Sequence, residues 1–225
     1  MERIKKNFFA RNWWKILCVL LLVYTIIGGL LVKVPDLPVI HQSIRAIFFH
    51  VGMWFSMIVL MLISATGSVL YLRSNNLRYD TLANEAVNTG IFFGILGILT
   101  GSVWARYTWG VWWLNDPKLN GAAVSLLAYF AYRVLRSSLT DAQKKARLAA
   151  VYNIFAFVLM IVFMMILPRT AADSIHPGKS GNPALTPGEL DSNLRLVFYP
   201  AMIGWIMLGI WILNFRIKRK SIIKH

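Results

Sequence analysis

Residues 49–72 read FHVGMWFSMIVLMLISATGSVLYL and contain no Asp, Glu, Lys or Arg. An α-helix needs roughly 20 apolar residues to cross the hydrocarbon core of a bilayer, because it rises about 1.5 Å per residue. The stretch therefore predicts a transmembrane helix. Five further apolar runs predict spans of the same kind, at about 13–32, 86–103, 121–135, 149–167 and 196–215. The run at 121–135 is the shortest and needs flanking residues to complete a crossing.

The composition supports this interpretation. Of the 225 residues, 57% are hydrophobic and 15% are charged, with a mean hydropathy of +0.58. A soluble domain carries about 25% charged residues. The excess of apolar side chains must therefore face lipid. The sequence predicts an all-α integral membrane protein: a bundle of six transmembrane helices forming a single membrane domain over residues 1–225.

The distribution of Lys and Arg predicts the orientation of the bundle. Seventeen of these residues lie in or beside the N-terminal segment, the connections 73–85 and 136–148, and the C-terminal tail. The other seven lie in the three remaining connections. Cytoplasmic loops carry the excess of positive charge. Both termini are therefore predicted to be cytoplasmic (N-in/C-in), with outer loops at 33–48, 104–120 and 168–195. The net charge of +15 is thus a topology signal, and nucleic acid is excluded as a partner.

The third apolar run has glycines at 90, 94, 97 and 101. Small residues at this spacing let transmembrane helices pack closely. We therefore expect this run to make a tight helix–helix contact inside the bundle.

The second outer loop contains the segment WARYTWGVWWLNDPK at 104–118, called here the Trp-rich segment. It holds four of the nine Trp residues of the chain. Trp is enriched at membrane interfaces, which is one explanation. A belt of that kind spreads Trp around a protein, however, and this concentration also suits a platform for a flat apolar ligand. Composition leaves both interpretations open.

Two histidines are predicted on the same outer face as the Trp-rich segment. His50 begins the second span, with Trp54 one helical turn further on, and His176 lies in the third outer loop. Two imidazoles on opposite sides of a flat ring are the arrangement that holds a six-coordinate haem iron. His41 competes for one position but lies in a more polar part of its loop.

Asp116 is followed by Pro117 directly before the fourth apolar run. Asp is a preferred helix N-cap and Pro a preferred first helical residue, so the pair predicts the start of a helix. Outer cations could balance the propionates of a haem. The candidates are Arg45, Arg106, Lys118, Arg169 and Arg195.

Catalytic motifs are missing from the sequence. The single cysteine, Cys18, excludes an internal disulfide, and the chain has no H-E-x-x-H or G-x-S-x-G motif. The chain is therefore not predicted to be an enzyme. Two alternatives remain beside haem handling: a permease subunit for another small molecule, and an electron-transfer subunit like a membrane cytochrome b. The first would need ionisable groups near the midplane and the second histidines within the spans.

The Trp-rich segment resembles the tryptophan-rich WWD motif of haem-handling proteins of cytochrome c-type biogenesis. With six predicted spans and one histidine in each flanking outer loop, the chain is most similar to the cytochrome c maturation protein C family (CcmC-type). The resemblance covers nearly the whole chain. It departs from the family pattern at Asn115, where Trp is usual, at Lys118, where Arg is usual, and at Gly52, where Pro is common.

The resemblance implies that His50 and His176 are the axial ligands of the haem iron. It also implies a haem-edge cradle made by Trp104, Trp109, Gly110, Trp112, Trp113 and Asp116. The cargo would be haem b, held non-covalently at the periplasmic face of the bacterial inner membrane. The implied partners are haem, a periplasmic haem chaperone, a small membrane subunit, the ABC transporter subunits of the maturation system and the lipid bilayer.

Overall fold

The computed structural model describes residues 2–35, 40–170, 174–176 and 190–223, and within them the secondary structure is entirely helical. The long helices are α1 (Glu2–Leu31), α2 (Ile47–Ser74), α3 (Leu77–Trp109), α4 (Pro117–Ser137), α5 (Ala142–Ile161) and α7 (Ser192–Ile223). The short elements are the 3₁₀ helix η1 (His41–Ala46), the π-helical turn η2 (Val162–Ile166) and α6 (Leu167–Thr170).

Five segments are long and apolar enough to cross a membrane: Asn12–Leu31, His41–Ser74, Leu77–Trp109, Ala142–Thr170 and Ser192–Lys220. Each coincides with or contains one predicted span to within one residue, so the prediction of an all-helical membrane protein is confirmed. The sixth predicted span, 121–135, lies in α4. That helix is long enough at 21 residues but less apolar, because it also carries Lys118, Arg133 and Arg136. Its crossing of the membrane stays a prediction.

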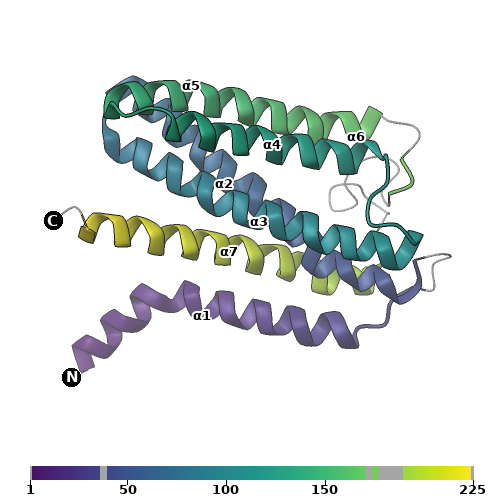
Figure 1. Cartoon of the computed structure of the whole chain (residues 1–225). Helices are drawn as coiled ribbons and strands as arrows, with labels where there is room; N and C mark the ends of the chain where they lie inside the picture. The colour runs from purple at the N-terminus through teal and green to yellow at the C-terminus, as the bar shows by residue number, and fades with distance from the viewer. Residues whose placement is uncertain (1, 36–39, 171–173, 177–189, 224–225) are drawn as a thin grey trace.

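The long helices lie side by side, and both chain termini lie at the same end of the bundle (Figure 1). The opposite end, called here the distal end, gathers the C-terminal ends of α1 and α3 and the N-terminal ends of α2, α4 and α7 (Figure 1). α2 packs against α3, α5 and α7, whereas α1 packs against α7. The described parts of the segments predicted as outer loops therefore belong to one end of the molecule.

The glycines of α3 form sockets for large side chains of α2. A Cβ atom at Gly101 would lie 2.6 Å from the imidazole of His50, and one at Gly97 would lie 2.7 Å from the indole of Trp54. The predicted close packing of this helix is therefore a series of side chains seated against glycine. The four pairs along the two antiparallel helices are His50–Gly101, Trp54–Gly97, Met57–Gly94 and Met61–Gly90.

The end that holds the termini is fastened by ion pairs. Glu85 of α3 is 2% exposed and accepts hydrogen bonds from Arg216, at 2.8 Å, and from Lys220, both on α7. Asp80 pairs with Arg136 of α4 through both carboxylate oxygens, at 2.5 and 3.0 Å. Glu85 directly precedes the predicted span 86–103, and its charge is balanced where α3 meets α7.

The predicted outer loop 104–120 is shorter in the structure than in the prediction. Trp104–Trp109 continue α3, which ends at Gly110 with a left-handed φ of 77°. Asp116 caps α4 and Pro117 is its first residue, as predicted. The non-helical connection is therefore 110–116. Two Trp of the Trp-rich segment consequently sit on a rigid helix, which a loop assignment did not anticipate.

Candidate functional site

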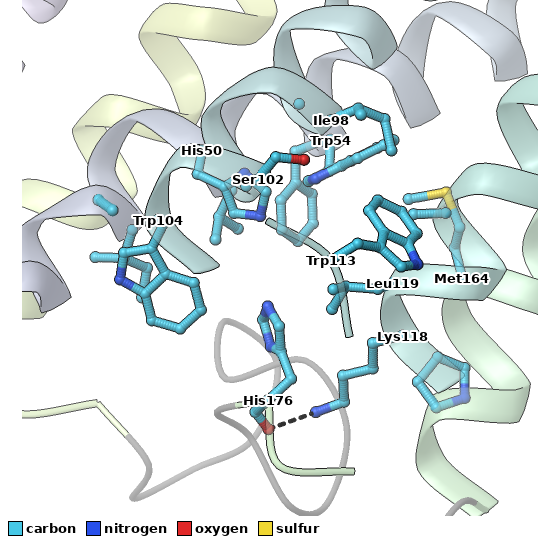
Figure 2. Close-up of a pocket in the computed structure, with 18 of the residues that line it drawn as sticks. His50, Trp54, Ile98, Ser102, Trp104, Trp113, Lys118, Leu119, Met164 and His176 are labelled. Atoms are coloured by element: carbon cyan, nitrogen blue, oxygen red, sulfur yellow. Dashed lines mark hydrogen bonds between the residues drawn. The ribbon is translucent and has the colours of Figure 1, made fainter. Parts of the chain in front are cut away.

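A mostly apolar cavity lies at the distal end of the bundle, between α2, α3 and the start of α4. Figure 2 shows the imidazole rings of His50 and His176 turned toward each other across an open space, with Trp104 and Trp113 on either side. The side chains that line the cavity include His50, Trp54, Trp104, Trp109, Trp113, Lys118, Met164 and His176, with Gly97 and Gly101 behind them.

His50 is held in place by α3. Its ring seats against Gly101, and its Nδ1 lies 3.1 Å from the hydroxyl of Thr100. That hydroxyl lies 2.7 Å from the carbonyl oxygen of Leu96, to which it donates its hydrogen. With its hydrogen donated there, the hydroxyl oxygen is an acceptor for Nδ1–H in the tautomer that carries its proton on Nδ1. This hydrogen bond leaves Nε2 unprotonated, which is the form of imidazole that binds a metal.

His176 comes from the short segment 174–176, and its ring lies against the two Trp at the end of α3. The ring centroids are 5.5 Å apart for Trp104 and 6.1 Å apart for Trp109. The backbone carbonyl of His176 accepts a hydrogen bond from Nζ of Lys118 at 3.3 Å. The ring is therefore supported by aromatic contacts, and its backbone is bound to the first turn of α4.

Two of the Trp side chains in the wall donate their indole N–H groups to protein acceptors, and the others pack edge-on against neighbouring rings. Trp104 is buried, donates to the backbone carbonyl of Ser43 at 3.1 Å and packs edge-on against Trp109 at 4.8 Å. Trp113 donates to Asn120 at 3.2 Å. Trp54 packs edge-on against His50, with centroids 6.3 Å apart. The cavity thus has flat aromatic walls of fixed orientation.

Asp116 lies behind this wall and is 3% exposed. Its carboxylate accepts hydrogen bonds from the backbone N–H of Lys118 at 2.8 Å, from the hydroxyl of Ser174 at 2.9 Å and from the backbone N–H of Ile175 at 3.0 Å. Burial alone would raise the pKa of Asp116, but these donors together hold its pKa below the ordinary value. A carboxyl group with a lowered pKa stays ionised at neutral pH, and its contribution to stability is lost only under acid conditions.

The arrangement suits a flat metal complex that brings its own equatorial ligands. Among the described residues, no group of three or more His, Cys, Asp or Glu side chains could enclose a bare metal ion. Two opposed imidazoles in an aromatic cavity could instead supply the axial ligands of such a complex.

A family model described as heme exporter protein C (CcmC) matches residues 4–224. The chain belongs to this family. The heme exporter protein C of Paracoccus denitrificans is 25% identical over 179 residues, covering 77% of this chain and 71% of that protein. The one from Bradyrhizobium diazoefficiens is 31% identical over 115 residues, covering 50% of this chain and 43% of that protein.

A second group of relatives shares a shorter region. The cytochrome c biogenesis protein CcsA of Prochlorococcus marinus subsp. pastoris is 33% identical over 89 residues, which is 40% of this chain and 28% of that protein. The family membership confirms the resemblance that the sequence suggested.

The structure brings together most of the residues predicted for the site. His50, His176, Trp104, Trp109 and Trp113 line the cavity. Three other predicted residues do not form its wall: Asp116 is buried behind it, and Gly110 and the 60% exposed Trp112 lie in or beside the connection that follows α3. The competitor His41 is exposed on η1 and does not line the cavity.

Several residues that line or support the site were not predicted from the sequence to be part of it. Gly97, Gly101 and Thr100 act from α3, and Met164 reaches the cavity from η2. The glycine spacing on α3 mirrors the spacing of His50 and Trp54 on α2. That mirrored spacing is the signal that could have paired the two helices in this register.

Proposed function

We propose that this protein holds haem between His50 and His176 at the periplasmic surface of the membrane and delivers it to a periplasmic haem chaperone during c-type cytochrome biogenesis. The opposed imidazoles of the two histidines, inside an aromatic cavity, are the observation that carries the proposal. Membership of the heme exporter protein C family supports it. Haem b would be bound non-covalently, as cargo.

The proposed topology has six spans in the bacterial inner membrane, with α4 as the sixth and both termini in the cytoplasm. The residues of α4 that point away from the bundle support a lipid-facing side: Val124, Leu127, Phe130 and Val134 are all exposed. In this orientation the distal end and its cavity face the periplasm. A small membrane subunit and the ABC transporter subunits of the maturation system are the proposed membrane partners.

Lys118 is the proposed partner of a haem propionate. It lines the cavity, whereas the four other predicted cations, Arg45, Arg106, Arg169 and Arg195, do not. Arg45 donates instead to the carbonyl of Gly29 at 2.7 Å, and Arg195 donates to the carbonyl of Leu190 at 2.8 Å. Among the described residues, the cavity therefore has one ammonium group, that of Lys118, beside its aromatic wall.

Transfer of haem needs only an exchange of axial ligands, so the proposal requires no catalytic residue. The permease and cytochrome b alternatives gain no support from the described residues. Glu85 is paired with cations of α7 at the opposite end from the cavity, and His50, at an outer end, is the one histidine of the sequence within the predicted spans. Among the described residues, neither transport through the midplane nor a transmembrane electron relay has residues to perform it.

Thr100→Val is expected to weaken haem binding about tenfold, within the range usual for loss of an outer-shell partner of a metal ligand. Valine keeps the shape of threonine but cannot accept from Nδ1–H of His50, so the Nε2-ligating tautomer loses its support. Haem affinity is measured by titration of the detergent-purified protein. Thr89→Val is the matched control, because the Thr89 hydroxyl donates to the carbonyl of Glu85 in the same helix, far from the cavity. Equal affinities for the two variants would contradict the role of Thr100.

Trp112→Ala tests the delivery step. Trp112 is 60% exposed beside the cavity, so its loss should slow transfer to the chaperone several-fold while haem content stays near the wild-type level. Transfer is followed by mixing the haem-loaded protein with the purified chaperone and measuring haem on each after separation. Trp13→Ala is the control, since Trp13 is equally exposed at the other end of the bundle. Undiminished transfer by the Trp112 variant would refute a presenting role for this side chain.

A further inference from the structure

We propose that Asp116 is a positioning residue that tethers the segment carrying His176 to the start of α4, and that it makes no contact with haem itself. The inference rests on the proposed haem site, and it assigns to Asp116 a role different from the haem-edge contact that the family resemblance implied.

The carboxylate of Asp116 is directed toward the 174–176 segment and away from the cavity. Both oxygens of Asp116 are taken by protein donors: one accepts from the backbone N–H of Lys118, and the other accepts from the hydroxyl of Ser174 and from the backbone N–H of Ile175. The side chain is 3% exposed and does not line the cavity. It therefore faces the 174–176 segment.

The two candidate ligands, His50 and His176, are held in different ways. His50 lies on α2 within a continuous helix and seats against Gly101 of α3. His176 lies on a non-helical segment. That segment is joined to α4 by the bonds from Ser174 and Ile175 to Asp116 and by the bond from Lys118 to the His176 carbonyl. The position of His176 therefore depends on Asp116 in a way that the position of His50 does not.

The hydrogen bonds that tether Ser174 and Ile175 are accepted by a charged group, the Asp116 carboxylate. A buried carboxylate is stabilised by several donors, and the hydrogen bonds that it accepts are about twice as strong as neutral ones. Ile175 directly precedes His176 in the chain, so the hydrogen bond from its N–H to Asp116 restrains the backbone next to the imidazole. An Asp in the tryptophan-rich motif thus connects the aromatic wall to the opposite ligand.

The test uses Asp116→Asn, which is nearly isosteric. Lys118 N–H and Ile175 N–H donate to different oxygens of Asp116, so Asn in the same orientation presents its NH2 donor to one of these two N–H groups. Ser174→Ala is the second variant, since it removes one tether bond and leaves the cap intact. Asp141→Asn is the control for capping, because Asp141 caps α5 through Lys144 N–H at 2.6 Å, away from the cavity.

Two readouts keep the tether separate from haem binding. Hydrogen exchange of the 174–176 amides in the haem-free protein reports the tether directly, and we expect at least about tenfold faster exchange at Ile175 in Asp116→Asn. The visible spectrum after haem addition reports the ligand. We expect Asp116→Asn to resemble His176→Ala, with five-coordinate haem, and to regain a six-coordinate low-spin spectrum when free imidazole is added. Ser174→Ala should change in the same direction and less, and Asp141→Asn should match the wild type.

Each result tests a different part of the proposal: the tether, the positioning of His176 or the haem site itself. Unchanged exchange at 174–176 in Asp116→Asn overturns the tether, whatever the haem spectrum. Faster exchange with an unaltered six-coordinate spectrum overturns the positioning of His176. Faster exchange in a protein whose wild type takes up no haem supports the tether and refutes the proposed function instead.

Discussion

The double variant His50→Ala/His176→Ala is expected to purify without haem. The two imidazoles, opposed across the cavity, are the proposed nitrogen ligands of the iron. Apolar burial of the ring would remain in the aromatic cavity, but the iron would lose both protein ligands. We expect the haem-to-protein ratio to fall by more than about tenfold, because each axial bond to iron contributes more than an outer-shell contact does. The ratio is measured by absorbance of the reduced pyridine complex.

His41→Ala is the matched control for this experiment. His41 is the third histidine predicted on the outer face, but it is exposed on η1 and does not line the cavity. Its replacement should leave the haem content unchanged. A double variant that retains wild-type haem content would sink the assignment of the ligands, and so would a His41 variant that loses haem.

Gly101→Ala is expected to lower haem affinity by roughly one order of magnitude, although it adds a single methyl group at the wall of the cavity. The new Cβ would lie 2.6 Å from Cε1 of His50, well inside van der Waals contact. The imidazole is a rigid ring on a helix, so it must rotate or shift, and its Nε2 must leave the axial direction. Such a displacement should convert the low-spin haem spectrum to a mixed or high-spin one.

Gly90→Ala separates this local effect from damage to the α2–α3 interface. A Cβ at Gly90 would also lie 2.6 Å from a side chain of α2, but that atom is the terminal methyl of Met61, which moves easily. Both variants should therefore remain folded, with similar thermal melts in detergent. If Gly90→Ala reduced haem affinity as much as Gly101→Ala does, the seat for His50 would have no special role.

The fold was predictable because it depends on composition over long stretches. Runs of apolar residues revealed the spans, and five of the six satisfy length and hydropathy in the structure. The helix start at Asp116–Pro117 was predictable from local capping chemistry. The limits of the helices were not, because Trp104–Trp109 are as compatible with an interfacial loop as with the last turns of α3.

The site was predictable only in its residue types. His50, His176 and the Trp residues are rare, chemically distinctive side chains, and their common face followed from the order of the spans. The contact of His50 with Gly101 and its hydrogen bond to Thr100 depend on the register between α2 and α3, which no local pattern reveals. The tether at Asp116 joins residues 58 and 59 positions apart in the sequence, and local capping already accounted for this side chain.

The central claim is that both axial positions of one haem iron are filled by this chain. The most direct measurement is the visible spectrum of the purified, haem-loaded wild type during titration with free imidazole. We predict a sharp Soret band with low-spin features that imidazole leaves unchanged, because His50 and His176 already occupy both axial positions of the iron. A high-spin spectrum that turns low-spin on adding imidazole would contradict it, since that result requires an open axial position.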